Sequence, residues 1–406
     1  MEVVSKYFYA AYGKYITRFR ALPLDIDMLR PVERRILLAV HDVAKGYAKS
    51  AKVVGHCLGN YHPHGDASVY QTLVKYVNMG LVDGQGGFYT HGIQKNPPAA
   101  MRYTEVKENE IIAKLMQLTP YAPHDVLEFA NEPIYIPSPI PIGLIGNKIS
   151  YGVSFHKTVY PTFKVLALFN KLLSLLEGKN KLLSPYLAGC KYVGSRHELS
   201  KLYKHGKCRL EFLPEYREEK DGLHLFGEPL SWNTVLRCLE KNKQSYMDLS
   251  AENTHVIIHK KCEDSLKQAV NCEVIVVNTA GEPRTAGIDS IILNAFEHYK
   301  LALETKLRDD INRKENILRD YKIIKEIKPY VSKYSNLDRI LKKVKEKNVD
   351  QVLKKYSITK LVNIESDITK ITKELDKLKT NVKNIDTFSI DQVNFLREDL
   401  KNVKEI

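Results

Sequence analysis

Apolar residues in the first part of the chain repeat at helical spacing in three short segments. In residues 31–46 they fall three and four positions apart, and Pro31 suits the first turn of a helix. A second segment, 50–60, starts at Ser50, and a third, 66–77, starts at Asp66; both are residue types that cap helix N-termini. Short helices joined by a tight turn predict a helix-turn-helix motif, whose last helix would enter a nucleic-acid groove.

A glycine-rich, strand-like stretch follows the third helix at residues 81–89. It contains Gly84, Gly86 and Gly87, which we interpret as turn glycines because no β-α-β pattern accompanies them, as a phosphate-binding loop would require. Three helices followed by a hairpin-like wing predict a winged-helix domain over residues 31–160, preceded by an N-terminal arm over 1–30.

The middle and the C-terminal part of the chain show different patterns. Residues 161–290 mix strand-like runs at 209–213, 255–259 and 273–277 with helical segments. Residues 292–328 contain no glycine or proline, and from Ile364 to Ile385 apolar residues alternate at steps of four and three, the heptad pattern of a coiled coil. We expect an α+β, multidomain fold: a mixed α/β domain over 161–290, then a long antiparallel coiled coil over 291–406, capped at about 329–357.

The charge of the chain favours a polyanionic partner. Its 406 residues carry a net charge of +14 with a pI near 9.2, although a basic chain can also simply be well solvated. No window has the roughly 18 consecutive apolar residues of a membrane span, so we expect no membrane association. The six cysteines are scattered without a Cys-x-x-Cys pair, which argues against a zinc site or disulfide framework and favours the reducing cytoplasm.

Arg102 and Tyr103 form the candidate catalytic pair. A phenol with a pKa of about 10 is a poor nucleophile at neutral pH, so Tyr103 must lose its proton as it attacks a phosphodiester. Arg102 can stabilise charge on the transition state of that attack. Transfer of the phosphoryl group to Tyr103 would conserve the bond energy, so that religation needs no nucleotide.

Other cations and two histidines lie in the helical segments that precede Tyr103. We expect Arg34 and Arg35 to clamp neighbouring phosphates. Histidine is the side-chain type whose charge changes near neutral pH, so His64 is the candidate to orient or relay a proton, with His62 as the less favoured twin. The expected DNA-binding residues, which position the backbone without reading the sequence, are Lys49, Lys52, His62 and Ser68.

Five ordered motifs give the chain a family resemblance. They are Arg20-Ala21-Leu22-Pro23, Pro31-Val32-Glu33-Arg34-Arg35, Tyr61-His62-Pro63-His64-Gly65-Asp66, Leu81-Val82-Asp83-Gly84-Gln85-Gly86 and Ala100-Met101-Arg102-Tyr103-Thr104-Glu105. Their order and spacing resemble the breakage-reunion (A) subunit of type IIA DNA topoisomerases, as in DNA gyrase and topoisomerase IV. The resemblance implies a winged helix, a shortened tower over the middle third, and a coiled coil with a C-terminal dimer gate.

The resemblance also implies an active site and partners. Two copies of Tyr103 would each form a 5′-phosphotyrosine on double-stranded DNA, and Arg20 would contact that DNA within the catalytic site. Ile149 aligns with the isoleucine that wedges between base pairs, although a plain core isoleucine fits the local sequence nearly as well. This chain shows no acidic metal cluster and no ATPase signature, so Mg²⁺ and ATP are expected on a B-type partner in an A2B2 assembly. Alone, the chain should bind DNA but cut it poorly.

Two further expectations follow from the resemblance. The sequence stops at Ile406, which leaves no room for a DNA-wrapping β-propeller, so we expect relaxation and decatenation rather than supercoiling, on a compact plan like that of phage or viral enzymes. Where the family offers a serine and an acid that hold the metal bridge of quinolone drugs, this chain has Ala67 and Gln71. We therefore expect weak quinolone sensitivity.

Three other classes of protein share part of this pattern. A tyrosine recombinase carries its nucleophile near the C-terminus and lacks a long coil. A non-enzymatic winged-helix protein dimerised by a coiled coil explains the expected fold but not Arg102-Tyr103 in its motif. A structural coiled-coil protein leaves the first 110 residues unexplained.

Overall fold

The computed structural model describes residues 8, 11–13, 15–16, 20–128, 130–153, 157–331, 356 and 364–403. The chain divides into two compact units, one formed by Met1–Tyr299 with Val393–Ile406 and the other by Lys300–Gln392. Among the described residues, no helix combines the length and the apolar character needed to cross a membrane.

Three helices near the start of the first unit carry the motifs. They are α2 (Pro31–Val43), α3 (Ser50–Asn60) and α4 (Asp66–Asn78), as the apolar spacing predicts. Their buried faces, with Ile36, Val53 and Leu73 almost inaccessible to solvent, pack against one another. The predicted caps are wrong: the N-cap positions are Lys49 and Gly65, and neither helix receives a side-chain cap.

A small antiparallel sheet in the order β1-β3-β2 accompanies these helices; its strands are β1 (Ala48–Lys49), β2 (Val82–Gln85) and β3 (Glu105–Glu108). The predicted hairpin is a long connection, because residues 86–104 separate the paired strands β2 and β3. Gly86 turns the chain at a φ of +104°. Gly84 lies inside β2, where a Cβ atom would clash with Val77 Cγ1, so close packing and not a turn requires this glycine.

The remainder of the first unit is mixed α/β, with a five-stranded sheet in the order β6-β7-β14-β9-β8. Its strands are β6 (Ile149–Val153), β7 (Lys157–Pro161), β8 (Cys190–Tyr192), β9 (Lys207–Pro214) and β14 (Gln268–Glu273). The other elements are α5 (Glu110–Leu115), α6 (Val165–Leu176), α7 (Arg196–His205), β4 (His124–Val126), β5 (Asn131–Pro133), β15 (Ile275–Val277) and β16 (Pro283–Thr285). The predicted strand 273–277 is interrupted, because the Val274 N–H bonds to the Gly206 carbonyl between β14 and β15.

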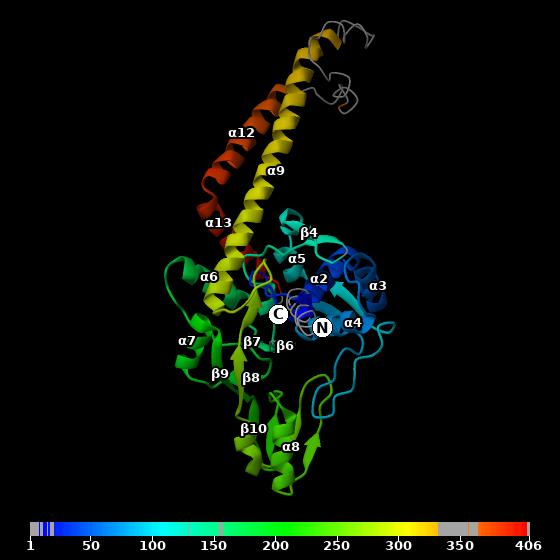
Figure 1. Ribbon diagram of the computed structural model, residues 1–406, viewed down its shortest axis with the longest axis vertical. Helices are drawn as coiled ribbons and strands as arrows, with labels where there is room; N and C mark the ends of the chain where they lie inside the picture. Colours follow the sequence, from blue (N-terminus) through cyan, green and yellow to red (C-terminus); the bar gives the residue numbers. More distant parts are fainter. Residues whose placement is uncertain are drawn as a thin grey trace. The chain divides into compact units, whose positions relative to one another are not determined.

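A four-stranded sheet with its own hydrophobic core forms what we call the β10–β13 subdomain, residues 216–266. Its elements are β10 (Tyr216–Glu218), β11 (Leu223–Leu225), α8 (Trp232–Lys241), β12 (Tyr246–Asp248) and β13 (Val256–Ile258). The strands lie in the order β10-β11-β13-β12, and α8 packs on them at the lower end of the view in Figure 1.

The second unit is an antiparallel helix pair, as predicted. It is built from α9 (Ile288–Val331), α12 (Ile364–Lys383) and the start of α13 (Ile385–Leu400). Three ion pairs join the helices: Lys325 to Glu365, Glu315 to Lys379 and Lys300 to Asp386. Residue numbers decrease along α9 in the direction in which they increase along α12 and α13, so the helices are antiparallel (Figure 1). Every heptad position from Ile364 to Ile385 is at least partly buried. The predicted cap at 329–357 lies almost entirely outside the described residues.

Candidate active site

The backbone around Tyr103 is held by the N-terminus of α3. The N–H of Ser50 donates to the Thr104 carbonyl at 3.0 Å, and the N–H of Ala51 donates to the Met101 carbonyl at 3.2 Å. The first N–H groups of a helix lack partners within the helix, so these two bonds satisfy both the N–H groups of α3 and the carbonyl groups of the Tyr103 segment. It fixes the chain immediately before and after the Arg102-Tyr103 pair.

Side chains reinforce the same attachment. Thr104 is fully buried, and its hydroxyl donates to Ser50 Oγ at 2.8 Å and lies 3.1 Å from the Tyr70 hydroxyl. The Tyr70 hydroxyl also donates to the Ala99 carbonyl at 2.5 Å. Tyr103 itself is 64% exposed, so a rigid backbone presents a phenol to solvent.

Arg102 accompanies this phenol. Its guanidinium carbon lies 4.6 Å from the centre of the Tyr103 ring, within the range of a cation–π contact. Both side chains are exposed, and Arg102 makes no ion pair with another described residue. Within that part of the chain, the Arg102 charge therefore stays available to an anionic ligand at the Tyr103 hydroxyl.

A second cluster joins four of the predicted residues, Arg20, Arg35, His62 and His64, to an acid that sequence reasoning missed, Glu128. Arg20 Nη2 lies 2.8 Å from His64 Nδ1, and His64 Nε2 lies 3.0 Å from Glu128 Oε1. Arg20 Nη2 also lies 3.3 Å from Nε2, but a guanidinium can only donate, so the shorter contact makes Nδ1 the acceptor and assigns the Nε2 proton to the bond with Glu128. Burial opposes ionisation of Glu128, but hydrogen bonds from Tyr15, Arg35 and His64 hold its pKa at about 2.

His62 lies deeper in the same cluster. Arg35 Nη1 donates to its Nδ1 at 3.0 Å, and the imidazole edge contacts the His64 ring. Burial, followed by the charge of Arg35, lowers the pKa of His62 to about 4. His62 is therefore neutral near pH 7, whereas the more exposed His64 stays accessible to a ligand.

The low pKa of His62 predicts a pH-dependent stability. The unfolded chain binds a proton at His62 near pH 6.5, whereas the folded chain binds it only near pH 4. Between these values the unfolded state holds more protons, so the free energy of unfolding falls as the pH is lowered, by about 3 kcal/mol in total. Urea unfolding across pH 4–7 measures this slope. His62→Gln, which keeps an acceptor for Arg35, should flatten the curve, and an equally steep curve in the variant would contradict the assignment.

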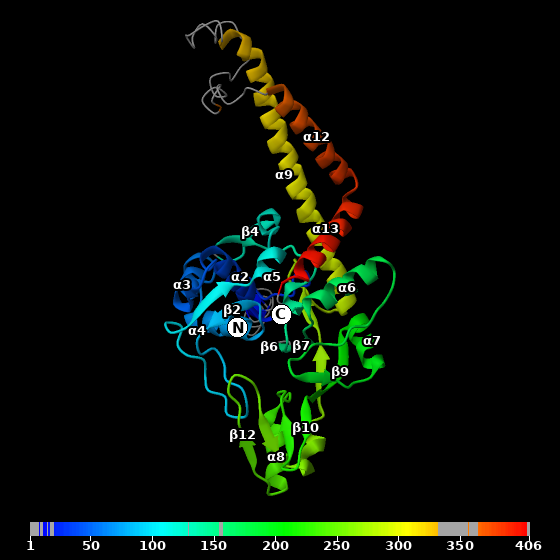
Figure 2. The same ribbon diagram turned by 180° about the vertical axis from the view of Figure 1, so that it is seen from behind.

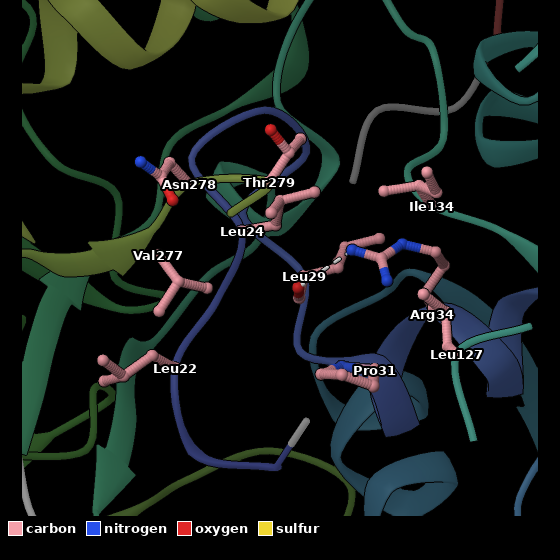
Figure 3. A pocket seen from close by; sticks show the side chains of 10 residues that line it. All are labelled: Leu22, Leu24, Leu29, Pro31, Arg34, Leu127, Ile134, Val277, Asn278 and Thr279. Atoms are coloured by element: carbon pink, nitrogen blue, oxygen red, sulfur yellow. Dashed lines mark hydrogen bonds between the residues drawn. The ribbon is translucent and has the colours of Figure 1, made fainter. Parts of the chain in front are cut away.

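The phosphate clamp predicted for Arg34 and Arg35 is wrong. Arg34 is buried and bound to Asp27 through two bonds, Nε–Oδ2 at 2.8 Å and Nη2–Oδ1 at 3.1 Å. It also donates to the Leu29 carbonyl and borders a cavity of only about 40 Å³ (Figure 3). Arg35, with no exposed side-chain surface, binds Glu132 and, at 2.5 Å, Glu128. Both guanidiniums are occupied by carboxylates, so neither can reach a phosphate.

The predicted phosphate contacts near α3 and α4 are exposed. Lys49 pairs with Glu105 at 2.8 Å, while Lys52 is exposed and has no ion pair with any residue that the structure describes. Ser68 is exposed on the first turn of α4, where its hydroxyl donates to the Gly65 carbonyl at 2.9 Å. Lys52 lies on α3 and Ser68 on α4, while Lys49 is the last residue of β1, directly before α3.

Ile149 lies apart from the cluster around Glu128. It is the first residue of β6 and is partly buried. With Lys148 and Tyr151 it lines a cavity of about 600 Å³ that extends to the β10–β13 subdomain.

Two acids, Glu128 and Glu132, were missed because no local pattern identifies them. They lie 93 and 97 residues from the Arg35 that they bind. His62, His64 and Glu128 offer ligand atoms within 4.8 Å of one another, the spacing of a metal site. The guanidiniums of Arg20 and Arg35 already donate to those atoms, and their charge opposes a cation there.

Comparison with known proteins places the chain in a family. Residues 20–401 match the model of a family described as the A subunit of DNA gyrase/topoisomerase IV. Because this match covers most of the chain, the protein belongs to that family, as the five motifs predict.

Individual relatives match in part. The A subunit of DNA topoisomerase 4 from Bacillus subtilis strain 168 is 35% identical over 176 residues, which is 39% of this chain and 21% of that protein. The corresponding topoisomerase 4 protein of Streptococcus pneumoniae is 32% identical over 225 residues, 50% and 27% of the two chains. The A subunit of DNA gyrase from Haloquadratum walsbyi is 25% identical over 358 residues, 76% and 41%. The chain thus spans less than half the length of each of these relatives.

Proposed function

We propose that this chain is the DNA-cleaving and religating subunit of a type IIA topoisomerase. The observation that carries the proposal is the Tyr103 segment: a backbone fixed by α3 presents an exposed phenol, with Arg102 at 4.6 Å, inside the region that matches the family model. A winged-helix protein that only binds DNA needs neither the exposed tyrosine nor the arginine beside it.

The proposed reaction is a reversible exchange of phosphodiester bonds. The Tyr103 oxygen attacks a backbone phosphorus and loses its proton, the bond to the 3′ oxygen breaks, and a 3′ hydroxyl leaves. The 5′-phosphotyrosine retains the bond energy, so attack by that hydroxyl restores the DNA strand. Arg102 stabilises the charge on the phosphoryl oxygens during both steps.

We assign the other cluster to DNA contact and proton movement. Arg20 and His64 lie at its more exposed side and reach a phosphate more readily than His62 does. Glu128 holds the His64 ring through Nε2, so Nδ1, which now faces Arg20, is the nitrogen that exchanges a proton once Arg20 turns to a phosphate. Arg35 has a positioning role in place of the predicted clamp, because it fixes His62 and Glu128 together.

The finer architecture follows the family. We propose that α2, α3, α4 and the β1-β3-β2 sheet act as a winged-helix domain, that the remaining sheets serve as a short tower, and that the antiparallel coil leads to a dimer gate. Two copies of Tyr103 then cut the two strands of double-stranded DNA, with Lys49, Lys52 and Ser68 on the backbone and Ile149 as a wedge. The assembly works in the cytoplasm.

We place the metal ion and the nucleotide of the reaction on a B-type partner. The two clusters of possible metal ligands among the described residues are His62–His64–Glu128, occupied by arginines, and the largely exposed Glu219–Asp221–His224 group. Neither lies in the Tyr103 segment. We therefore propose that Mg²⁺ and ATP bind the partner in an A2B2 enzyme and that strand passage is driven from there.

The test uses the chain with a B-type partner, Mg²⁺, ATP and supercoiled plasmid. The wild type should relax the plasmid and form covalent complexes when denatured during turnover. Tyr103→Phe should bind the plasmid with unchanged affinity and show neither activity. Equal relaxation by the variant would remove Tyr103 from the chemistry, and binding without any relaxation by the wild type would favour the non-enzymatic alternative.

Weak quinolone sensitivity is a further expected outcome. Ala67 and Gln71 are exposed one turn apart on α4, and neither side chain can hold the water–metal bridge of these drugs. Restoring both groups with Ala67→Ser and Gln71→Glu should lower the drug concentration that traps cleavage by about tenfold, the equivalent of about 1.4 kcal/mol. Titration of drug-trapped plasmid cleavage measures the effect. Trapping of the wild type at the concentration that suffices for the double variant would contradict this expectation.

A further inference from the structure

The loop that leads to Tyr103 is docked on the β10–β13 subdomain. We call residues 88–98 the strap; in Figures 1 and 2 it descends from the end of β2 to the side of that subdomain. Ile93 packs against the subdomain's hydrophobic core, which includes Leu223, Val256 and Ile258. A surface loop of this length has no local reason to bury an isoleucine in a distant core.

Backbone contacts fix the tip of the strap. The Ile93 N–H donates to Asp248 Oδ2 at 2.8 Å. The preceding residue, Gly92, has a φ of +88°, and a Cβ atom there would stand 2.5 Å from Asp248 Oδ2 and 2.7 Å from Ser250 Oγ. At this positive φ, only glycine allows the approach without displacing the side chains of Asp248 and Ser250.

Charged side chains add a second attachment. Lys95 forms an ion pair with Glu228, and His91 Nδ1 lies 3.6 Å from the same carboxylate. The Thr254 hydroxyl bridges the two, 3.4 Å from His91 and 3.5 Å from Glu228. The strap therefore meets the subdomain on two sides of its tip.

The other end of the strap is rigidly joined to the catalytic segment. The Ala99 N–H donates to the Gly87 carbonyl at 2.7 Å and closes the base of the loop, while the Ala99 carbonyl accepts from Tyr70. Tyr103 follows at once, its own N–H bonded to the Ala100 carbonyl at 2.9 Å. Five residues, 94–98, separate Ile93 from Ala99; Lys95 among them is paired with Glu228, and Pro97 and Pro98 have a restricted φ.

We propose that the strap is a positioning element through which the β10–β13 subdomain holds Tyr103 in its cleavage-competent place. The inference rests on the proposed function and extends it to residues outside the five motifs. Ile93 and Lys95, with Asp248 and Glu228 as their partners, are positioning residues. A displacement of the subdomain is transmitted to the Tyr103 backbone along the strap.

A charge exchange tests the coupling. Lys95→Glu and Glu228→Lys should each slow covalent complex formation at saturating DNA by about fivefold, the upper range for a partly exposed ion pair, and the double variant should recover most of the rate. The matched control is the ion pair of Lys260 and Glu218, 2.5 Å apart in the same subdomain but away from the strap. Exchanging that pair should leave the rate unchanged.

A second readout is independent of cleavage. In the DNA-free chain, Lys95→Glu and Ile93→Ala should speed amide hydrogen exchange in residues 99–103, with the global unfolding free energy measured alongside. The strap proposal would be overturned if Lys95→Glu and Ile93→Ala both left the hydrogen exchange of residues 99–103 and the cleavage rate unchanged. The proposed function would stand in that case, provided that Tyr103→Phe abolishes cleavage. If the strap variants exchanged faster but Tyr103→Phe still cleaved DNA, the proposed function would be overturned and the coupling between the strap and residues 99–103 would remain.

Discussion

Replacing Arg35 with alanine will destabilise the protein by about 3–5 kcal/mol, the largest effect expected of any single substitution at the site. The guanidinium has no exposed surface and compensates two carboxylates that are themselves almost fully buried, Glu128 and Glu132. Its loss leaves those charges without a partner in a region of low dielectric constant and removes the donor to His62 Nδ1.

Urea unfolding monitored by circular dichroism measures this loss. The control is Arg308→Ala, because Arg308 also pairs with a carboxylate, Glu304, but is 63% exposed on α9. An exposed pair of this kind contributes about 0.5 kcal/mol. Equal losses in the two variants would show that Arg35 is not the buried centre of the network.

Replacing Arg102 with alanine will slow DNA cleavage by about 10²- to 10³-fold, the usual effect of removing one group that stabilises transition-state charge. The fold should be unaffected, since Arg102 is exposed and its side chain rests on the Tyr103 ring. Arg102→Lys keeps the charge but loses the planar fork of donors, so an intermediate rate is expected.

Single-turnover formation of the covalent complex at saturating DNA measures the chemical step separately from binding. Arg308→Ala again serves as the control for loss of one exposed positive charge. A cleavage rate within a factor of two of wild type for Arg102→Ala, with DNA affinity reduced instead, would make Arg102 a binding residue only.

Local patterns predicted the helices well, because periodicity depends on neighbours a few residues apart. The three helices after Pro31 and the heptad run from Ile364 all formed where their spacing placed them. The cap predicted at Ser50 is wrong because a tertiary contact occupies its hydroxyl: Ser50 accepts a hydrogen bond from Thr104 and does not cap α3. The single strand predicted at 273–277 is wrong for a similar reason: the Val274 N–H bonds to the Gly206 carbonyl, which is distant in the sequence, and this contact divides the strand.

The candidate site was predictable only where its residues stand in a motif. Tyr103 and Arg102 are adjacent in sequence, and the structure keeps them in contact. The sequence alone does not distinguish buried arginines such as Arg34 and Arg35 from exposed arginines that bind phosphate. Their burial depends on acids at Asp27 and Glu132, which the chain brings close only after folding.

Identification of the amino acid that carries DNA tests the central claim most directly. Cleavage complexes of the chain with a B-type partner and Mg²⁺ are trapped, digested with nuclease and trypsin, and mapped by mass spectrometry. The chain has 24 tyrosines, so the assignment is decisive. We expect a nucleotide on Tyr103 alone, in the peptide from Tyr103 to Lys107; a nucleotide on any other residue would contradict the proposed chemistry.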